Sequence, residues 1–189
     1  EILRCLVGSE MCIRDRFYGY ITEGLYQVDD FNYDASTQTY TLKDGVPYHG
    51  DKGRIRPGMW KFKNLTGDDN VIDENDKTVI GNAQPKFYGG LNNSFTYKGF
   101  DLSIFLTFSY GNEVLNATKL VTSKVGSLNY NALDVMNSSN RWMTINSDGR
   151  KVTDPGELAA LNAGKTVAAY HDAQQGDNYI HSWAVEDAS

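Results

Sequence analysis

The stretch Phe100–Tyr110, which reads FDLSIFLTFSY, decides the expected fold of this chain. Every second residue in it is large and apolar, while aspartate, serine and threonine fill most of the positions between. The apolar set comprises Phe100, Leu102, Ile104, Leu106, Phe108 and Tyr110. Such a repeat has the period of a β-strand, because successive strand side chains point to opposite faces. The stretch therefore predicts a strand with one apolar face and one mostly polar face.

A weaker alternation precedes this strand at Lys86–Tyr97, and Lys98-Gly99 separates the two segments. A short loop with glycine in second place suits a tight hairpin turn, because such turns need positive φ angles. We therefore predict that the two segments form an antiparallel hairpin that turns at Lys98-Gly99.

Two environments are compatible with the apolar face of Phe100–Tyr110. A strand that crosses a membrane needs roughly 9–11 residues, and aromatic residues bound its lipid-facing stripe. In a soluble β-sandwich the same face would instead pack on a second sheet. The alternation taken by itself favours the sandwich, because the signal of a membrane strand is weak in any single segment. In the membrane case the apolar row should be substantially exposed in the isolated chain.

The composition of the whole chain excludes several classes of protein. Its 189 residues are about one domain, and its formal net charge of −6 argues against a nucleic-acid-binding protein, which usually carries a basic stripe. Hydrophobic residues make up 40% and charged residues 22%, which is too apolar for a disordered chain. The chain has 12 Tyr, 8 Phe and 18 Gly but no run of 18 apolar residues, so we expect an all-β fold without a transmembrane helix.

Segments outside the hairpin carry weaker patterns. We predict one strand or a bent pair at Phe17–Val28, and a short hairpin around Tyr40–Tyr48. Ala132–Met136 and Gly156–Ala163 are candidate short helices, the second with a cap residue and a first-turn proline in Asp154-Pro155. The scarcity of pattern after residue 112 is unusual inside a compact domain and typical of a long external loop.

The first 16 residues, Glu1–Arg16, read EILRCLVGSEMCIRDR and match neither strand nor helix periodicity well. They resemble the translated read-through of a sequencing adapter, so we interpret 1–16 as a non-native tail. The alternative is a genuine but divergent β-strand. Both cysteines, Cys5 and Cys12, lie in this tail. Without the tail, the chain has no residue for a disulfide, a thiolate–metal site or a cysteine nucleophile.

Five segments of the chain stand in the same order as motifs of one known family. The segments are Phe17–Gln27, Pro57–Leu65, Asp73–Gly81, Asn82–Tyr110 and Ser182–Ser189. Phe17–Gln27 resembles FYGYxTDGIFQ, and Asp73–Gly81 is close to DENDRTVIG. Both are motifs of the SusC/RagA family of TonB-linked outer-membrane proteins. Several ordered motifs are more specific than any single one, so the chain resembles this family from residue 17 to its last residue.

The resemblance implies that the chain is a fragment of a large antiparallel transmembrane β-barrel with long extracellular loops. It replaces the sandwich interpretation of the hairpin and places the turn at Lys98-Gly99 on the periplasmic side, since short turns of such barrels are periplasmic. It also implies that the chain consists of three segments. Residues 1–16 are the tail, residues 17–111 are barrel strands with an extracellular loop insert, and residues 112–189 are a long extracellular loop leading to a truncated strand.

The resemblance further implies transport without catalysis in the outer membrane of Bacteroidetes. Members of the family import oligosaccharides or peptides with energy from TonB and with a SusD-like surface lipoprotein as partner. The segment that contacts TonB would lie upstream of this chain. The implied partners are the lipoprotein, TonB, the substrate and outer-membrane lipid, with no nucleic acid. The alternative is a soluble β-sandwich module that binds carbohydrate, either with or without calcium. Such a module would bury the apolar face under a second sheet.

The acidic segment Asn64–Asp76 (NLTGDDNVIDEND) is the one candidate site for a cofactor, which would be calcium. Calcium loops place oxygen ligands at alternating positions of a tight turn. The candidate ligands are Asp68, Asp69, Asn70, Asp73 and Asp76. The resemblance to the family's DxNGDGxIDxxD is damaged, since Asn64 and Thr66 stand at its first ligand positions. We therefore prefer the alternative of an acidic turn held by its own backbone contacts.

Other polar residues do not form a catalytic constellation. Histidines occur at His49, His171 and His181 without the spacing of metal ligands, so we interpret them as surface-loop residues. Five residues fall in the expected external loops, where a sugar could stack on an aromatic ring or where the side chains simply pack. They are Glu113, Asp134, Arg141, Trp142 and Tyr170, and no binding role is assigned to them.

Overall fold

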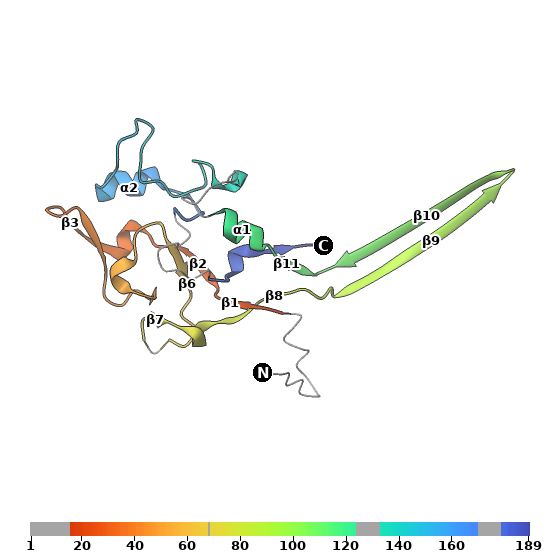
Figure 1. Ribbon diagram of the computed structural model, residues 1–189, viewed down its shortest axis with the longest axis horizontal. Coiled ribbons are helices and arrows are strands. Elements are labelled where there is room, and N and C mark those ends of the chain that lie inside the picture. Colours follow the sequence, from red (N-terminus) through yellow and green to blue (C-terminus); the bar gives the residue numbers. More distant parts are fainter. Residues whose placement is uncertain (1–15, 68, 124–132, 170–178) are drawn as a thin grey trace.

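The computed structural model describes residues 16–67, 69–123, 133–169 and 179–189. These residues form a compact body and one long hairpin that projects from it (Figure 1). Strands outnumber helices among them, which confirms the predicted all-β class. The strands of the body are β1 (Arg16–Gly19), β2 (Thr22–Leu25), β3 (Phe31–Asp34), β4 (Thr39–Leu42), β5 (Tyr48–His49), β6 (Trp60–Phe62), β7 (Val71–Ile72), β8 (Thr78–Asn82), β11 (Glu113–Leu115) and β12 (Val185–Asp187). The tail predicted at 1–16 lies outside the described residues, apart from Arg16 at the start of β1.

The body is assembled from short strands that pair two by two. In the described chain every sheet has two strands, and the sheets do not close into a barrel. The pairs β1–β8, β2–β6, β3–β4 and β11–β12 are antiparallel, and β5–β7 is parallel. Strand β12 comes from the far end of the chain, and the Tyr20 backbone forms a bridge with His181. Residues on both sides of the hairpin therefore build one body.

The helices of the described chain are short. The α-helices are α1 (Ala117–Thr122) and α2 (Pro155–Leu161), and the 3-10 helices are η2 (Val28–Asp30), η3 (Lys52–Arg54), η4 (Glu74–Asp76), η5 (Asp134–Met136) and η6 (Ser182–Ala184). The predicted helix at Gly156–Ala163 is confirmed as α2, and the Asp154 carboxylate caps it by accepting from the Glu157 N–H at 3.0 Å. Within the described residues, no helix has the length and apolarity to cross a membrane.

Two of the weaker strand predictions have different outcomes. The bent pair predicted at Phe17–Val28 is confirmed as β1 and β2. The hairpin predicted around Tyr40–Tyr48 is wrong, because the hairpin of this region is β3–β4. Its turn follows Asp34, whose carboxylate accepts from the Ser36 N–H at 2.9 Å and from the Thr37 hydroxyl at 2.9 Å. The chain also turns at Asp44-Gly45, the pair on which the prediction relied, but β4 pairs with β3 and β5 pairs with β7, so no hairpin forms around that turn.

The core of the body is held by a close contact between Gly58 and Trp142. Gly58 has a φ of 86°, and a Cβ atom added to it would lie 2.4 Å from the Trp142 ring. The Trp142 side chain is only 2% exposed, and its backbone N–H donates to the Val167 carbonyl at 2.8 Å. The Ala169 N–H donates to the Gly58 carbonyl at 3.0 Å. Three segments that are distant in the sequence thus meet at one tryptophan, and position 58 needs a glycine for both its backbone angle and its packing.

The projecting hairpin consists of β9 (Phe87–Tyr97) and β10 (Phe100–Tyr110), each 11 residues long. The strands pair without a break from Phe87 opposite Tyr110 to Tyr97 opposite Phe100. Lys98 and Gly99 have φ angles of 46° and 85°, which are the positive values that a tight hairpin turn needs. The antiparallel hairpin predicted with its turn at Lys98-Gly99 is therefore confirmed.

Candidate functional site

The register of the hairpin gathers its apolar residues on one face. Residues directly opposite each other in an antiparallel pair point to the same side. The first face carries Phe87, Gly89, Leu91, Asn93, Phe95 and Tyr97 of β9 with Phe100, Leu102, Ile104, Leu106, Phe108 and Tyr110 of β10. The second face carries Tyr88, Gly90, Asn92, Ser94 and Thr96 with Asp101, Ser103, Phe105, Thr107 and Ser109. We call these the apolar face and the polar face of the hairpin.

Aromatic residues lie at both ends of the apolar face, and its centre carries Leu91, Leu102, Ile104 and Leu106 together with the polar Asn93. Tyr97 and Phe100 are beside the turn, whereas Phe87 and Tyr110 stack with ring centroids 5.2 Å apart next to the body. Ile104 near the middle is 39% exposed, and Phe100 at the tip is 79% exposed. The row predicted to be substantially exposed is therefore confirmed as exposed. Aromatic ends around a mostly aliphatic centre are typical of a strand surface that spans a lipid layer.

Two glycines on β9 are covered by aromatic rings of β10. A Cβ atom at Gly89 would lie 2.6 Å from the ring of Phe108, so this ring occupies the space that a side chain would need. On the polar face, a Cβ atom added at Gly90 would lie 3.5 Å from the ring of Phe105. A cross-strand ring thus fills the gap that each of these glycines leaves.

The acidic segment forms a turn around the carboxylate of Asp76, which is fully buried. Its Oδ1 atom accepts from the Leu65 N–H at 2.7 Å and the Thr66 N–H at 2.9 Å, and its Oδ2 atom accepts from the Asp73 N–H at 2.9 Å. Burial raises the pKa of Asp76, but the hydrogen bonds from Thr66, Asp73 and Leu65 outweigh it and hold this pKa below its usual value. The carboxylate therefore acts as the centre of the turn.

The other candidate calcium ligands are spread along this turn. Asp73 caps η4 by accepting from the Asn75 N–H at 2.7 Å, and Asp69 accepts from the Val71 N–H at 3.1 Å. The backbone carbonyl of Asn70 accepts from Tyr48, and Asp68 lies outside the described residues. Among the residues that the structure describes, no three histidine, cysteine or acidic side chains are grouped to hold a metal ion. Calcium binding at this segment stays a prediction.

Replacing Asp76 with asparagine should destabilise this turn by about 2 kcal/mol, because an amide removes the charge and turns one acceptor into a donor facing the Asp73 N–H. Hydrogen exchange of the amides in 64–80 would measure the local opening free energy. Asp69→Asn is the matched control and should change it by less than about 0.5 kcal/mol. The loss should be equal with calcium and with a chelator. A loss that needs calcium would instead support a calcium site.

Two histidines belong to an aromatic cluster in the body, so the prediction that they lie on surface loops is wrong. His49 is 3% exposed and His181 is fully buried. The ring of His49 lies 4.9 Å from Phe62 and 5.2 Å from Tyr179, and His181 lies 5.2 Å from Trp60. Their burial depends on contacts between distant segments, so the residues next to each histidine in the sequence do not reveal it. His171 lies outside the described residues.

Acidification should loosen the body through His49. Desolvation by burial lowers the pKa of His49 to about 4, below its ordinary value of 6.5, so the folded state favours the neutral ring. Between these two values the unfolded chain binds a proton that the folded chain does not, and stability therefore falls as the pH falls. From pH 7 to pH 5 the loss should be roughly 2 kcal/mol.

Hydrogen exchange around β5 and β6, corrected for intrinsic rates at each pH, would measure this loss. The His49→Phe variant keeps an aromatic ring but has no titrating group at this position. Its opening free energy should change much less between pH 7 and pH 5. An equal loss in both proteins would show that another group carries the pH dependence.

The residues considered for sugar stacking mostly serve the packing of the body. Trp142 is buried against Gly58, so its ring faces are not available to a ligand. The Glu113 carboxylate accepts from the Asn82 N–H at 2.7 Å and joins β11 to β8. Asp134 begins η5, Arg141 is half-buried, and Tyr170 lies outside the described residues. The structure thus agrees with the packing interpretation for Trp142 and Glu113.

Comparisons with known proteins add evidence that is independent of this geometry. No family model matches the chain. TonB-dependent receptor P39 of Formosa agariphila is 34% identical over 118 residues, which cover 51% of this chain and 11% of that protein. TonB-dependent receptor P3 of the same organism is 35% identical over 104 residues, which cover 55% of this chain and 9% of that protein. These partial matches support the TonB-dependent receptor family.

The TonB-dependent receptors that match are much longer than this chain. The chain spans about a tenth of their length, with 11% of one and 9% of the other aligned. The apolar face and the polar face of the hairpin agree with these matches, because side chains on the strands of a membrane barrel alternate between lipid and lumen.

Proposed function

We propose that this chain is part of a SusC/RagA-type, TonB-dependent transporter that imports oligosaccharides or peptides through the outer membrane. It works together with a SusD-like surface lipoprotein and draws its energy from TonB. The transporter has no catalytic role, and outer-membrane lipid surrounds the apolar face of its hairpin. The ordered family motifs support the subfamily and the lipoprotein partner, and the two receptor matches support the broader class.

The observation that carries this proposal is the uncovered apolar face of β9–β10. Each strand has 11 residues, close to the roughly 9–11 that a tilted strand needs to cross a bilayer. Lipid would remove the whole aliphatic row from water, which is favourable by about 25 cal/mol for each Å² of apolar surface. The backbone edges of the hairpin would pair with neighbouring strands of the barrel.

The body lies at the open end of the hairpin, opposite the turn at Lys98-Gly99 (Figure 1). With the short turn on the periplasmic side, the body would lie at the extracellular mouth of the transporter. Loops at that mouth are where a surface lipoprotein and an incoming substrate would meet the transporter.

The alternative of a soluble β-sandwich carbohydrate-binding module is not favoured. Such a module would need a second sheet over the apolar face, and in the described part of the chain the hairpin pairs only with itself. The described sheets of the body lie beyond one end of the hairpin and leave its apolar face exposed.

Cysteine labelling of the full-length protein in cells would test this proposal. In a background without other cysteines, Ser103→Cys should react with a small hydrophilic thiol reagent, because the polar face would line the aqueous interior. Leu102→Cys, on the apolar face, should be protected by lipid until the membrane is dissolved. Equal labelling of both variants in intact cells would contradict the proposal.

A further inference from the structure

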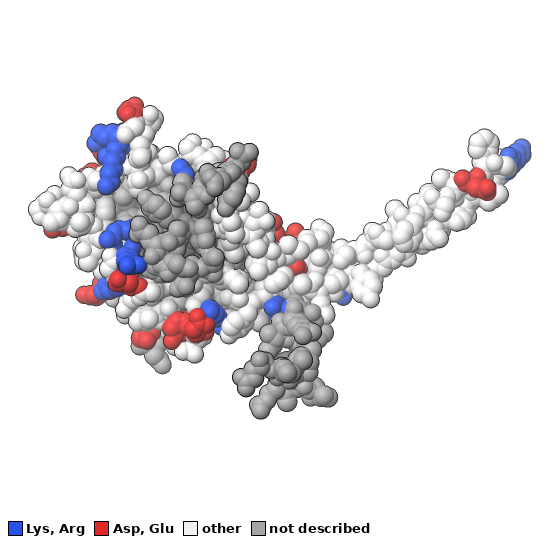
Figure 2. Space-filling view, in the orientation of Figure 1, with Lys and Arg blue, Asp and Glu red and all other residues white. Residues whose placement is uncertain are grey.

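The edge of β10 that points away from β9 is open to a further strand. In the described part of the chain β10 pairs only with β9, so we call the other side the free edge of β10. Soluble proteins protect such edges with charged side chains, proline or a covering element. The only charged residue of β10 is Asp101 beside the turn, and Figure 2 shows no charged side chains between the tip and the base of the hairpin. The free edge therefore lacks the features that prevent pairing.

A strand that approaches this edge begins in the body. β12 pairs antiparallel with β11, and Glu113 lies opposite Asp187 at the end of the pair nearest the hairpin. Beyond this pair, the Ala188 N–H donates to the Asn112 carbonyl at 3.0 Å. One residue separates Asn112 from the end of β10. Because β9 already occupies the other side of β10, the ladder between β11 and β12 can continue only along the free edge.

Gly111 allows the strand to exchange one neighbour for the other. Residues two apart in a regular strand direct their backbone groups toward the same neighbouring strand. The Tyr110 carbonyl accepts from the Lys86 N–H at 2.9 Å on the side of β9, whereas the Asn112 carbonyl accepts from Ala188 on the side of β12. Gly111 has a φ of 79°, and a Cβ atom added to it would lie 2.8 Å from the Lys86 side chain. Such a switch at a glycine adds one residue to one strand of a pair, as a β-bulge does.

The space beside the base of the hairpin is empty enough to admit a strand. A cleft of about 290 Å³ lies there, and Ser189 lines it together with Lys86, Tyr110 and Gly111. Figure 1 shows the C-terminal residue beside β11, on the side of β10 and away from β9. Residues that follow Ser189 would therefore start next to Tyr110.

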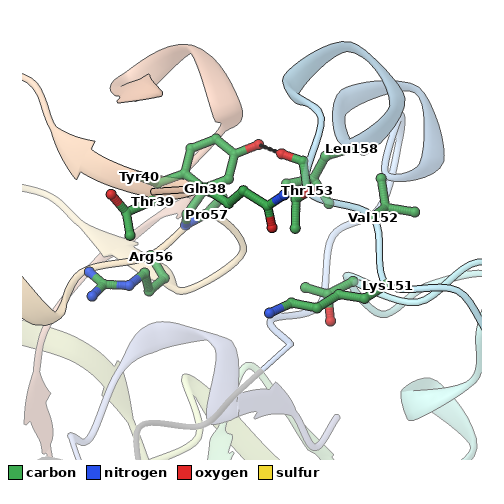
Figure 3. A pocket seen from close by; sticks show the side chains of 10 residues that line it. Gln38, Thr39, Tyr40, Arg56, Pro57, Lys151, Val152, Thr153 and Leu158 are labelled. Atoms are coloured by element: carbon green, nitrogen blue, oxygen red, sulfur yellow. Dashed lines mark hydrogen bonds between the residues drawn. The ribbon is translucent and has the colours of Figure 1, made fainter. Parts of the chain in front are cut away.

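A pocket elsewhere in the body does not offer a place for this strand. It has about 250 Å³ and lies between the β3–β4 hairpin and the segment that leads into α2. At its side the Tyr40 hydroxyl donates to the Thr153 carbonyl at 2.7 Å (Figure 3). Its lining contains no residue of β9, β10 or β12. This pocket therefore belongs to the packing of the body and not to the edge of the hairpin.

We infer that the segment following Ser189 in the full-length protein pairs antiparallel with the free edge of β10. The inference rests on the proposed function, in which the chain is part of a longer transporter, and it gives one hairpin edge a partner and a register. With one extra residue at Gly111, Ser189 lies opposite Tyr110. The third residue after Ser189 then lies opposite Thr107, and the seventh lies opposite Ser103. Residues 116–184 become a single excursion between two neighbouring strands.

Disulfide formation between introduced cysteines would test this pairing in the full-length protein in membranes, in a background without other cysteines. Thr107→Cys should cross-link best to a cysteine at the third residue after Ser189, and Ser103→Cys to one at the seventh. The reason is that directly opposite residues of an antiparallel pair have Cα atoms about 4.5–5.5 Å apart, within the range of a disulfide. Both positions lie on the polar face, where an aqueous oxidant would reach them. Moving the cysteine four residues back along β10 should move its best partner four residues forward.

Two controls use residues that the structure describes. Val114→Cys with Glu186→Cys is the positive control, because these residues lie opposite each other in β11 and β12. Asn92→Cys is the negative control, because it lies on the polar face of β9 and β10 would separate it from the new strand. Strands two apart in a sheet are about 9.5 Å from each other, which is too far for a disulfide.

The cross-linking pattern decides the inference. A positive control that forms while neither β10 position cross-links beyond Ser189 would overturn it, as would a best partner that moves backward when the β10 cysteine moves backward. Best partners at the fourth and eighth residues would overturn the register, because they would show that Gly111 adds no residue.

The outcomes separate this inference from the proposed function. Protein that passes the cysteine-labelling test but forms no cross-link to β10 would overturn the strand pairing alone. Protein with equal labelling of both hairpin faces would overturn the proposed function, whatever cross-links it forms.

Discussion

Replacing Trp142 with alanine should destabilise the body by roughly 3–5 kcal/mol, the range found when a large buried aromatic side chain is removed. Trp142 is 2% exposed and fills the space left by the missing side chain of Gly58. Without the ring, the segment that contains Gly58 and the segment that contains Val167 lose their common contact. Hydrogen exchange of the amides in β6 and in 166–169 would measure the local opening free energy.

Ile145→Ala is the matched control for this prediction. Ile145 is 48% exposed and lies three residues further along the same segment, so its truncation should change the opening free energy by less than about 0.5 kcal/mol. Gly58→Ala should be strongly destabilising in the unchanged protein and less so in the Trp142→Ala background, because the clash with the ring is then absent. Additive losses would show that the two positions do not form one contact.

Replacing Ile104 with lysine should destabilise the inserted protein by roughly 2–4 kcal/mol, the cost of a cation on the lipid face near the bilayer midplane. Ile104 is the fifth residue of β10, between Leu102 and Leu106 on the apolar face and opposite Asn93 of β9. Equilibrium unfolding in urea of the full-length protein in lipid vesicles would measure the loss.

Ser103→Lys is the control on the opposite face of the same strand. Because the polar face would line an aqueous interior, this charge should remain hydrated and change stability by less than about 1 kcal/mol. An equal loss in both variants would show that the two faces lie in the same environment, contrary to the proposed orientation. Unchanged stability of Ile104→Lys would show that the apolar face is not in contact with lipid.

The hairpin could be predicted from the sequence because its causes are local. The alternation in Phe100–Tyr110 specifies which side chains share a face, and Lys98-Gly99 specifies where the chain reverses. The cap of α2 at Asp154 is local in the same way. One strand cannot show whether lipid or a second sheet covers its apolar face, so the alternation alone favoured a sandwich that the structure does not favour.

Features of the body were missed where they depend on distant residues. The burial of His49 and His181 follows from their contact with Phe62, which lies in a different segment of the chain. The hairpin of this region was misplaced because Asp44-Gly45 is a strong turn signal, and the chain does turn there, but the strand after it pairs with β7 and not with β4. The sequence left two interpretations of the acidic segment, a set of calcium ligands or a turn held by its own backbone contacts. Only the hydrogen bonds that the Asp76 carboxylate accepts show that this residue is the centre of the turn.

The amino-acid sequence by itself determined the two-faced hairpin of this protein, because strand period and turn chemistry act over a few neighbouring residues. The tertiary structure alone decided the body and its pocket. Thr22 meets Ser182 across 160 residues, and Tyr40 meets Thr153 across 113 residues. Such contacts form only when the burial of apolar side chains, led by Trp142, offsets the entropy lost in closing long loops. That balance is a property of the whole packed body, and no short segment contains it.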